Sequence, residues 1–373
     1  VDVEVWCGQP TINRDLGRLA SQTSHAGIRI RRLRGTRFPK LNTPGRVVNQ
    51  LTFAGSVLTN MVLRRPRRPL LVLTNPPFIA PICALNRLLG GAPYAYLVFD
   101  VYPDTAVNLD VIQKDSLVAR VWEKTNRLSY RFASRTIFIG RCMEDIVRPR
   151  LPRRARERSV IIPVWADDPA ISATTGESPF VQRWDLDGKF VVGYSGNMGR
   201  FHDMETPMEV ARRLRDHRDI QFLFVGEGYK KDACVRFAEE HELDNCRFET
   251  YVPREELGHL LRTFDAGLVT LLEGQEGLSV PSKTFGLLAA GTPVLGVMSP
   301  RSEIARILDE RECGFNIRPG DADGLMNAVL KLKKDKKLAA KFSRNGKRAV
   351  QETYGLQAVA DRYVELLAEM GSH

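Results

Sequence analysis

The chain of 373 residues is longer than one hydrophobic core usually supports, and this length predicts two domains. Its composition, 43% hydrophobic and 27% charged, is typical of a soluble globular protein. No apolar run reaches the ~18 residues that a membrane-spanning helix requires. The six cysteines are scattered and form no CxxC pair, which argues against a metal cage and favours a reducing cytosol.

Charge divides the chain unevenly. Residues 1–170 hold 27 lysines and arginines against 13 acidic residues, a net charge of +14, whereas the remainder holds 28 against 31. The basic excess gathers in three segments, at 28–37, 63–69 and 148–158. We therefore expect the first half of the protein to bind a negatively charged partner.

The first half alternates short apolar strands with helices. Strands are expected at 1–7, 28–33, 70–74, 94–99, 136–139 and 159–162, and helices at 47–63, 79–89, 117–132 and 142–150. Such alternation predicts a parallel sheet with helices on both faces.

A polar stretch rich in turn-forming residues, at 164–188, then interrupts the pattern, and we interpret it as the interdomain linker. Beyond it, strands are expected at 189–194, 221–225, 247–249, 266–272 and 294–297, and helices at 205–215, 229–241, 254–262, 283–290, 302–308, 321–333, 337–353 and 356–370. We predict two doubly wound, Rossmann-like α/β domains, over 1–163 and 189–353, with a last helix within 354–370. Ligands of such folds bind in the crevice at the carboxyl ends of the strands.

The stretch at 276–293 has the outline of a phosphate site. A polar loop leads into the helix expected at 283–290, which Gly291 ends and Pro293 prevents from resuming. Ser282 is a candidate N-cap, and the free N–H groups of the helix start favour an anion beside Lys283. The alternative is an ordinary strand-to-helix turn with a surface lysine.

Two further loops follow predicted strands at the same sheet edge. In residues 195–200, glycines allow backbone N–H groups to approach an anion, and Arg200 could make a bidentate phosphate contact. The loop Gly226-Glu227-Gly228 follows the next strand. Each could be only a tight turn, but together they indicate a site for a nucleoside diphosphate.

The order of the motifs resembles glycosyltransferase family 4, the retaining nucleotide-sugar enzymes of the GT-B fold, whose two Rossmann-like domains face each other across a cleft. The resemblance is nearest to the bacterial branch that builds surface polysaccharides and lipid-linked saccharides, including colanic-acid and N-acetyl-fucosamine transferases. It covers nearly the whole chain and rests on YSGNMGR (194–200), FVGEGY (224–229), TYVPREEL (250–257), EGLSVPSKTFGLLAAGTPV (276–294), NPP (75–77), FDVYPDTAV (99–107) and IIPVWAD (161–167).

The resemblance implies roles for individual residues. Those expected at the donor pyrophosphate are Gly196, Asn197, Arg200, Pro281, Ser282 and Lys283. Those expected to border the base are Gly226, Glu227, Gly228, Tyr251 and Val252. The donor sugar is expected at Glu276, Gly277, Leu278 and Ser279. On the acceptor side the resemblance implies Asn75 and Asp104, with Asp100 near the anomeric carbon or the acceptor hydroxyl. Asp100, Arg200, Glu276 and Lys283 are the expected catalytic group.

The sequence departs from the family pattern in three places. The second of the family's two glutamates falls on Gly286, so the ribose contact stays open. Glu276 stands two residues before the expected first glutamate, and the family's first strand and its glycine loop would precede Val1.

The family's chemistry implies a hexosyl transfer with retention from a UDP-sugar to a lipid-linked saccharide or polysaccharide precursor. The leaving phosphate can accept the hydroxyl proton, so no metal and no cofactor is expected, and Asp185-Leu186-Asp187 is interpreted as a solvated turn. The basic first half would dock on the inner face of the cytoplasmic membrane, as a peripheral protein. One alternative is a UDP-sugar 2-epimerase of the same fold. The other is a nucleic-acid-binding protein, but the basic segments lack the interleaved aromatic residues that favour nucleic-acid binding.

Overall fold

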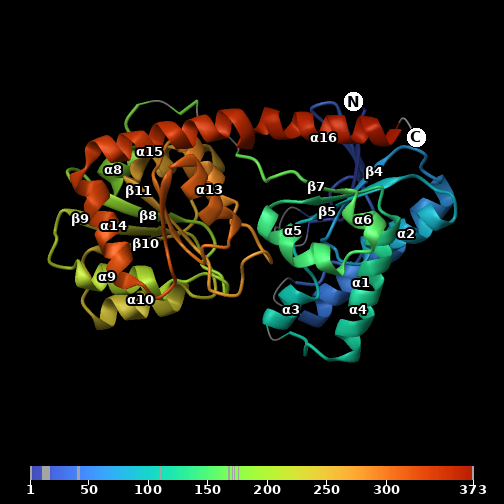
Figure 1. Ribbon diagram of the computed structural model, residues 1–373, viewed down its shortest axis with the longest axis horizontal. Coiled ribbons are helices and arrows are strands. Elements are labelled where there is room, and N and C mark those ends of the chain that lie inside the picture. The colour runs from blue at the N-terminus through green and yellow to red at the C-terminus, as the bar shows by residue number, and fades with distance from the viewer. Residues whose placement is uncertain are drawn as a thin grey trace. The chain divides into compact units, whose positions relative to one another are not determined.

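The computed structural model describes residues 2–10, 17–39, 43–109, 111–166, 169, 171, 173–174 and 176–371. The chain divides into two compact units (Figure 1). The N-terminal unit comprises Val1–Phe138, Val147–Ile161 and Tyr363–His373, and the C-terminal unit comprises Ile139–Ile146 and Ile162–Arg362. Residue 1 of the first expected strand, and residues 167–168, 170, 172 and 175 of the expected linker, lie outside the described residues.

The C-terminal unit is built on a sheet whose described strands all run parallel. Its strand order is β10-β9-β8-β11-β12-β13, so the direction of winding reverses between β8 and β11. The strands are β8 Phe190–Ser195, β9 Ile220–Val225, β10 Cys246–Glu249, β11 Ala266–Thr270, β12 Val294–Val297 and β13 Gly314–Ile317. The sequence did not predict β13, which reads Gly-Phe-Asn-Ile and lacks a continuous apolar run.

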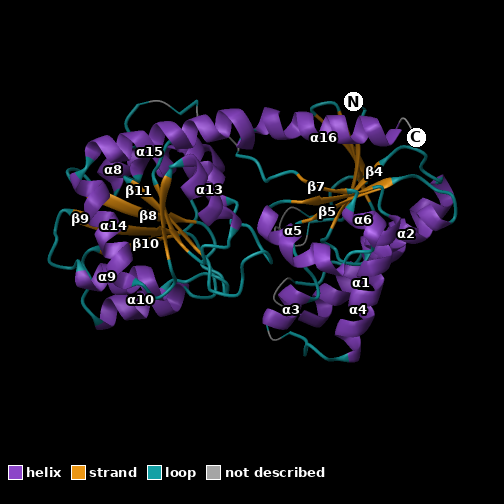
Figure 2. Ribbon diagram, viewed as in Figure 1, coloured by secondary structure: helices purple, strands orange, loops and turns teal. Residues whose placement is uncertain are grey.

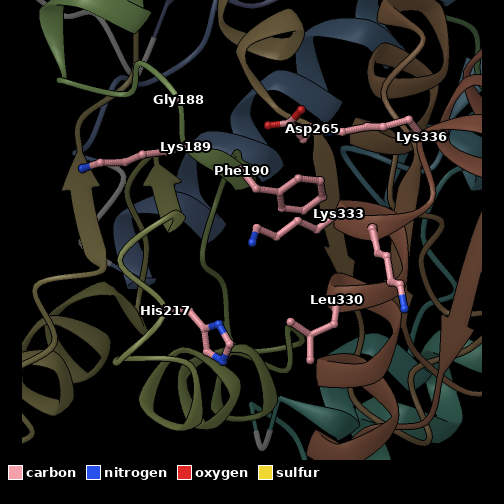
Figure 3. A pocket seen from close by; sticks show the side chains of 9 residues that line it. Gly188, Lys189, Phe190, His217, Asp265, Leu330, Lys333 and Lys336 are labelled. Carbon is pink, nitrogen blue, oxygen red and sulfur yellow. The ribbon is translucent and has the colours of Figure 1, made fainter.

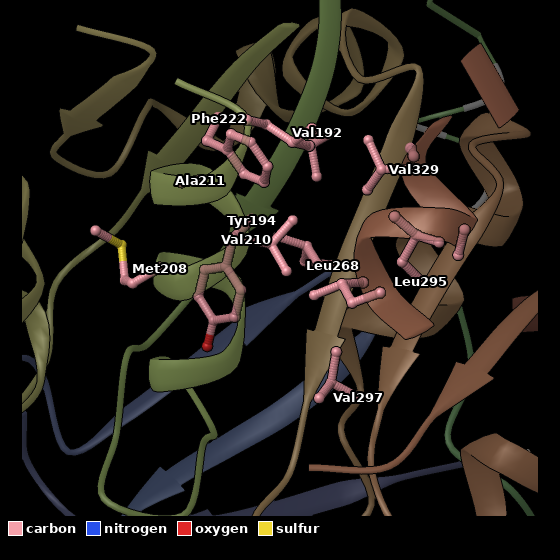
Figure 4. Packing of buried hydrophobic residues seen from close by; sticks show 14 of the residues in the cluster. Val192, Tyr194, Met208, Val210, Ala211, Phe222, Leu268, Leu295, Val297 and Val329 are labelled. Atoms are coloured by element: carbon pink, nitrogen blue, oxygen red, sulfur yellow. The ribbon is translucent and has the colours of Figure 1, made fainter. Parts of the chain in front are cut away.

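Alternation along these strands builds the core of the unit. Every second residue of β8, including Val192 and Tyr194, points to the same face and is fully buried (Figure 4). That face packs against α9 (Glu205–Arg213) and α14 (Ala322–Lys334). Helices lie on both faces of the sheet (Figure 2).

The other face of the sheet accepts helices because it carries glycines. A Cβ on Gly267 of β11 would lie 2.5 Å from Leu287 of α12 (Lys283–Ala290). A Cβ on Gly296 of β12 would lie 2.9 Å from Leu308 of α13 (Glu303–Arg311). The remaining helices of the unit are α8 Pro179–Arg183, α10 Lys231–Glu240, α11 Leu257–Thr263 and α15 Lys336–Ala349. The last of these continues as a π-helical turn at Val350–Tyr354.

Helix α8 lies within the stretch that the sequence predicted to be an irregular linker. Ser178 caps it by accepting a hydrogen bond from the N–H of Phe180. Phe180 is fully buried and stacks on Trp184, with ring centroids 4.5 Å apart. The helix packs against α11, so this part of the stretch belongs to the core of the C-terminal unit.

The N-terminal unit contains two sheets in its described residues. One is parallel, with order β4-β5-β6-β7, and the other has order β1-β3-β2. The sequence did not predict β2, which pairs antiparallel with β3. Strand β2 reads Gln-Thr-Ser-His and is exposed, so it has no apolar pattern, and Ala26 and Gly27 form its hairpin turn with positive φ angles. The strands are β1 Glu4–Cys7, β2 Gln22–His25, β3 Ile28–Arg32, β4 Leu70–Leu73, β5 Tyr94–Val98, β6 Arg135–Phe138 and β7 Ser159–Ile161.

Helices of this unit are α1 Thr43–Arg64, α2 Ile79–Leu88, α3 Asp104–Asn108, α4 Leu117–Phe132 and α6 Arg153–Arg156. Helix α5 (Arg141–Val147) belongs, except for Val147, to the C-terminal unit. Helix α16 (Leu356–Gly371) begins in the C-terminal unit and ends in the N-terminal unit, where Glu369 pairs with Arg135 at 3.1 Å. Among the described helices none is long and apolar enough to cross a membrane.

Candidate functional site

The two glycine loops meet where β8 and β9 end. The N–H of Gly196 donates to the carbonyl of Val225 at 2.9 Å, and that of Met198 donates to the carbonyl of Glu227 at 2.8 Å. Gly226 has φ +145°, and a Cβ there would lie 2.0 Å from the carbonyl oxygen of Gly196. Both the backbone conformation and the space therefore require glycine at this position.

Lys283 joins these loops from the start of α12, on the other side of the winding reversal. Its Nζ would lie 3.3 Å from a Cβ on Gly196, so the amino group faces the bare backbone of that loop. Nζ donates to the hydroxyl of Tyr194 at 2.5 Å, and that hydroxyl donates to the carbonyl of Asn197 at 2.8 Å. A lysine and a glycine backbone brought together in this way can hold a phosphate.

Burial lowers the pKa of Lys283 to about 7. A lysine in water has a pKa of about 10.4, so the surroundings disfavour the charged ammonium when no anion is present. A bound phosphate would restore the charge because it supplies the missing counter-ion. Lys283 is therefore suited to bind an anion, whose presence would favour the charged ammonium.

The start of α12 differs from the prediction in one respect. Ser282, expected to cap the helix, has helical φ and ψ angles, and its side chain accepts no hydrogen bond from the helix. An N-cap side chain reaches the helix N–H groups only from an extended backbone. The cap assignment of Ser282 is therefore wrong, whereas Gly291 ends the helix in the left-handed conformation, as predicted.

His202, which follows the first glycine loop, is a further member of this cluster. Its Nδ1 lies 2.7 Å from the carbonyl oxygen of Thr270, at the end of β11. Burial, followed by the charge of Lys283, lowers the pKa of His202 to about 4. The ring is neutral at pH 7 and its proton sits on Nδ1, because a carbonyl can only accept, so Nε2 is left as an acceptor.

Arg200 and Lys283 have different contact partners. Its guanidinium stacks over the exposed ring of Tyr229, 4.0 Å from the centroid, in the loop that follows β9. Glu227 in the same loop is paired with Lys231 at 2.8 Å. Of the remaining residues expected near the base, Tyr251 is exposed and Val252 is half-buried, both after β10.

Glu276 is buried and only half of its carboxylate is engaged. Oε1 accepts from Arg301 at 2.8 Å, whereas Oε2 is buried without a partner among the described residues. Burial opposes the charge, but backbone hydrogen bonds and Arg301 outweigh it and hold the pKa of Glu276 below its usual value. A buried carboxylate oxygen without a donor suits a hydroxyl of a bound ligand.

The other residues of this loop are positioned around Glu276. Gly277 has φ +80°, Leu278 and Pro281 are buried, and Ser279 forms an isolated parallel bridge with Glu276. Gly286 occupies the family's second glutamate position, and a Cβ added there would lie 3.2 Å from Cδ1 of Leu261. The structure therefore offers no polar group at that position.

The acceptor-side candidates lie at the carboxyl edge of the N-terminal unit. Asn75 is exposed after β4, and Asp100 is half-buried after β5, where burial raises its pKa. The hydroxyl of Thr74 accepts from the N–H of Asp100 at 3.3 Å and ties the two strand ends together. Asp104 is not free, because Arg150 binds both of its oxygens at 2.7 and 2.8 Å.

A cavity of about 510 Å³ lies elsewhere, at the amino ends of the strands of the C-terminal unit (Figure 3). Phe190 at the start of β8 and Asp265 just before β11 line it, together with Lys333 and Lys336. It is not part of the loop cluster, which stands at the carboxyl ends. Within the described ranges, no group of three or more His, Cys, Asp or Glu side chains is arranged to hold a metal ion.

A doubly wound parallel sheet, with glycine loops and a lysine at the point of reversal, defines the C-terminal unit as a Rossmann-like ligand-binding domain. Residues 179–349 match the family described as "Glycosyl transferases group 1", so the C-terminal unit contains a domain of that family.

Two curated relatives come from bacteria. WbjE of Pseudomonas aeruginosa, described as a glycosyltransferase, is 33% identical over 270 residues, which are 71% of this chain and 66% of WbjE. WcaI of Escherichia coli K12, described as a colanic acid biosynthesis glycosyl transferase, is 25% identical over 72% of this chain and 67% of WcaI. The chain thus spans about two thirds of the length of these relatives.

The fold is shared with a solved structure of HepE from Anabaena in complex with UDP and glucose. The TM-score is 0.70, with 15% sequence identity, over 92% of this chain and 86% of HepE. The predicted fold class, α/β of the GT-B type, is confirmed.

Proposed function

We propose that this group 1 glycosyltransferase moves a hexosyl group from a UDP-sugar, with retention, to a hydroxyl of a lipid-linked saccharide or polysaccharide precursor. The descriptions of WbjE and WcaI as glycosyltransferases support the transfer reaction. The description of WcaI, which names colanic acid biosynthesis, supports a polysaccharide precursor as the acceptor, and the UDP complex of HepE supports a UDP-sugar as the donor. These descriptions favour a transferase over the epimerase and the nucleic-acid-binding protein that the sequence left open.

The contact of Lys283 with the bare backbone at Gly196 is the observation that carries the proposal. Two further features support it. The start of α12, where the helix dipole favours a negative charge, stands at this lysine, and the unpartnered Oε2 of Glu276 lies in the loop that leads to α12. A diphosphate at Lys283 and a sugar hydroxyl at Glu276 would satisfy both features with one ligand.

The chemistry asks the protein mainly for charge stabilisation. As the bond between the anomeric carbon and the phosphate oxygen breaks, its electron pair stays on the leaving diphosphate. Lys283 and the start of α12 would stabilise that charge, which is the type of interaction that usually dominates enzymatic rate enhancement. The acceptor hydroxyl bonds to the anomeric carbon on the same face and gives its proton to a leaving phosphate oxygen. No step in this scheme needs a metal ion.

Ligand-dependent melting tests the donor assignment. UDP should raise the melting temperature, and further at higher UDP concentrations, since a ligand that binds only the folded state stabilises it. UDP-glucose, UDP-galactose and UDP-N-acetylglucosamine, compared with GDP-mannose, then identify the nucleotide and the sugar. Absence of any shift with the uridine nucleotides would remove the proposal.

For the acceptor, we propose an anionic membrane surface that carries the lipid-linked saccharide. Exposed apolar residues follow one face of α1, at Val47, Leu51, Leu58 and Val62. Arginines flank this stripe at both ends, at Arg46 and at 64–68. An apolar stripe between basic ends is typical of a helix that lies in a membrane interface, where basic residues gain about 1 kcal/mol each near anionic lipids.

Vesicle co-sedimentation tests this docking surface. The protein should bind vesicles with anionic lipid, less at high salt, and Leu51→Glu with Leu58→Glu should abolish binding because both residues lie on the stripe. The matched control is Leu88→Glu on α2, an exposed apolar residue outside the stripe. Binding that ignores lipid charge, or an unaffected double variant, would overturn the proposal.

A further inference from the structure

One short segment of the chain packs in a different unit from the residues before and after it in the sequence. Residues 139–146, which include most of α5, pack in the C-terminal unit, although the residues on both sides belong to the N-terminal unit. The segment is therefore held in the C-terminal unit by its own contacts. Asp145 pairs with Arg306 of α13 at 2.9 Å, and three further hydrogen bonds of the segment converge on one residue of the same helix.

That residue is Glu303, in the first turn of α13 and almost fully buried. Its Oε2 accepts from the backbone N–H of Arg141 at 2.5 Å and of Cys142 at 3.4 Å, and its Oε1 accepts from Nε of Arg141 at 2.9 Å. Gly140 leaves no room for a side chain, since a Cβ would lie 2.9 Å from Cγ of Glu303. One carboxylate thus holds the beginning of α5 against α13.

The same segment of α5 supports the loop of Glu276. A Cβ on Gly277 would lie 2.4 Å from Cδ1 of Ile146 and 2.5 Å from the carbonyl oxygen of Cys142. Burial raises the pKa of the Cys142 thiol to about 11, and a hydrogen bond from the backbone of Gly277 is among the smaller opposing influences. Gly277 therefore rests directly on α5, one residue after the half-engaged carboxylate of Glu276.

We propose that Glu303 is a positioning residue for the donor sugar, acting through α5 and Gly277 on the carboxylate of Glu276. The inference rests on the proposed function, in which Glu276 binds the sugar and Lys283 binds the diphosphate. Because Glu303 supports only the sugar loop, it governs the affinity for the sugar part of the donor and not for the nucleotide part.

If Glu303 positions the sugar loop, its substitution should weaken binding of a UDP-sugar but not binding of UDP. Glu303→Gln keeps the shape of the side chain but removes the charge that holds the α5 backbone and Arg141. We expect the dissociation constant of the tightest-binding probe among UDP-glucose, UDP-galactose and UDP-N-acetylglucosamine to rise about tenfold. The dissociation constant of UDP should stay within about twofold of wild type, since Lys283 and Gly196 are untouched.

Glu310→Gln is the matched control, because Glu310 also binds Arg141, at 2.5 Å, but through the guanidinium and not through the α5 backbone. It should leave both dissociation constants unchanged. Gly277→Ala approaches the same contact from the loop side and should give the same split. It serves as the deciding variant if Glu303→Gln does not fold.

Isothermal titration of folded variants decides the matter. An unchanged affinity for the nucleotide sugar in Glu303→Gln, or an equal loss for UDP and UDP-sugar, would overturn the positioning role. Wild-type protein that binds none of these nucleotides would instead show that the proposed function fails, so the two failures are distinguishable.

Discussion

The carboxyl edges of the two parallel sheets look equivalent in the sequence but differ in construction. In the C-terminal unit, Gly196 and Gly226 come from two loops and Lys283 from the start of α12. They pack so closely that a Cβ on Gly226 would lie 2.0 Å from the carbonyl oxygen of Gly196. In the N-terminal unit, Asn75 is exposed and Asp104 is occupied by Arg150. The comparison teaches that the residues proposed for the donor are already in contact in the folded chain, whereas those proposed for the acceptor are separate groups that the acceptor itself would bring together.

The largest effect is expected from Lys283→Ala. Transfer should fall by about a hundredfold or more, because the amino group stabilises charge that develops on the leaving diphosphate. The circular dichroism spectrum, which serves as the check on folding, should not change. Lys230→Ala is the control, because Lys230 follows the neighbouring loop but is paired with Glu205 at 2.7 Å. Activity of Lys283→Ala within a few-fold of wild type would remove this residue from the mechanism.

Glu276→Gln should have the next largest effect. Loss of the carboxylate should weaken binding of the best UDP-hexose by about tenfold, because the hydrogen bond to a charged group is replaced by a weaker one. The affinity for UDP should not change. Titration calorimetry with both ligands measures the difference, and an equal loss for both would show that Glu276 supports the fold and not the sugar.

A pH dependence of about fivefold should accompany the lowered pKa of Lys283. Donor binding requires the protonated amine, and the unliganded lysine loses its proton as the pH rises through about 7. Affinity for a UDP-sugar should therefore decrease between pH 7 and 8 and be nearly constant below pH 6. In Lys283→Arg the dependence should vanish, because arginine stays protonated. A UDP-sugar affinity that rises with pH would contradict the assignment.

The smallest effect is expected at the acceptor edge. Asp104→Asn should leave transfer within about twofold of wild type and cost at most about 1 kcal/mol of stability, because its ion pair with Arg150 is partly exposed. Asp100→Asn is the informative partner variant, since within the described ranges no arginine pairs with Asp100. It should slow transfer without changing the dissociation constant of the UDP-sugar. A large loss in Asp104→Asn would show that the acceptor edge is also preformed.

Local signals predicted the elements around the donor end. The helix at 283–290 was predicted to the residue, because Gly291 and Pro293 end it by their own backbone geometry. Strand β2 was missed because its residues are polar and exposed. The failed cap of Ser282 shows that a residue type indicates a cap but does not set its φ and ψ angles.

The contacts that define the site were not predictable in the same way. The sequence placed Arg200 and Lys283 together, but Arg200 stacks on Tyr229, and Lys283 bonds to Tyr194, 89 residues away. Glu303 reads as an ordinary acidic residue in the first turn of a helix. Its function depends on α5, which is more than 150 residues distant in sequence. Such contacts depend on packing between segments that are distant in the sequence, and they cannot be predicted from periodicity along the chain.

A crystal structure of the protein with UDP tests the central claim most directly. The account predicts the phosphates at the end of β8, with a phosphate oxygen within about 3 Å of the amino group of Lys283 and close to the backbone of Gly196. Well-defined UDP at another place, such as the lysine-lined cavity at the amino ends of the strands, would contradict it.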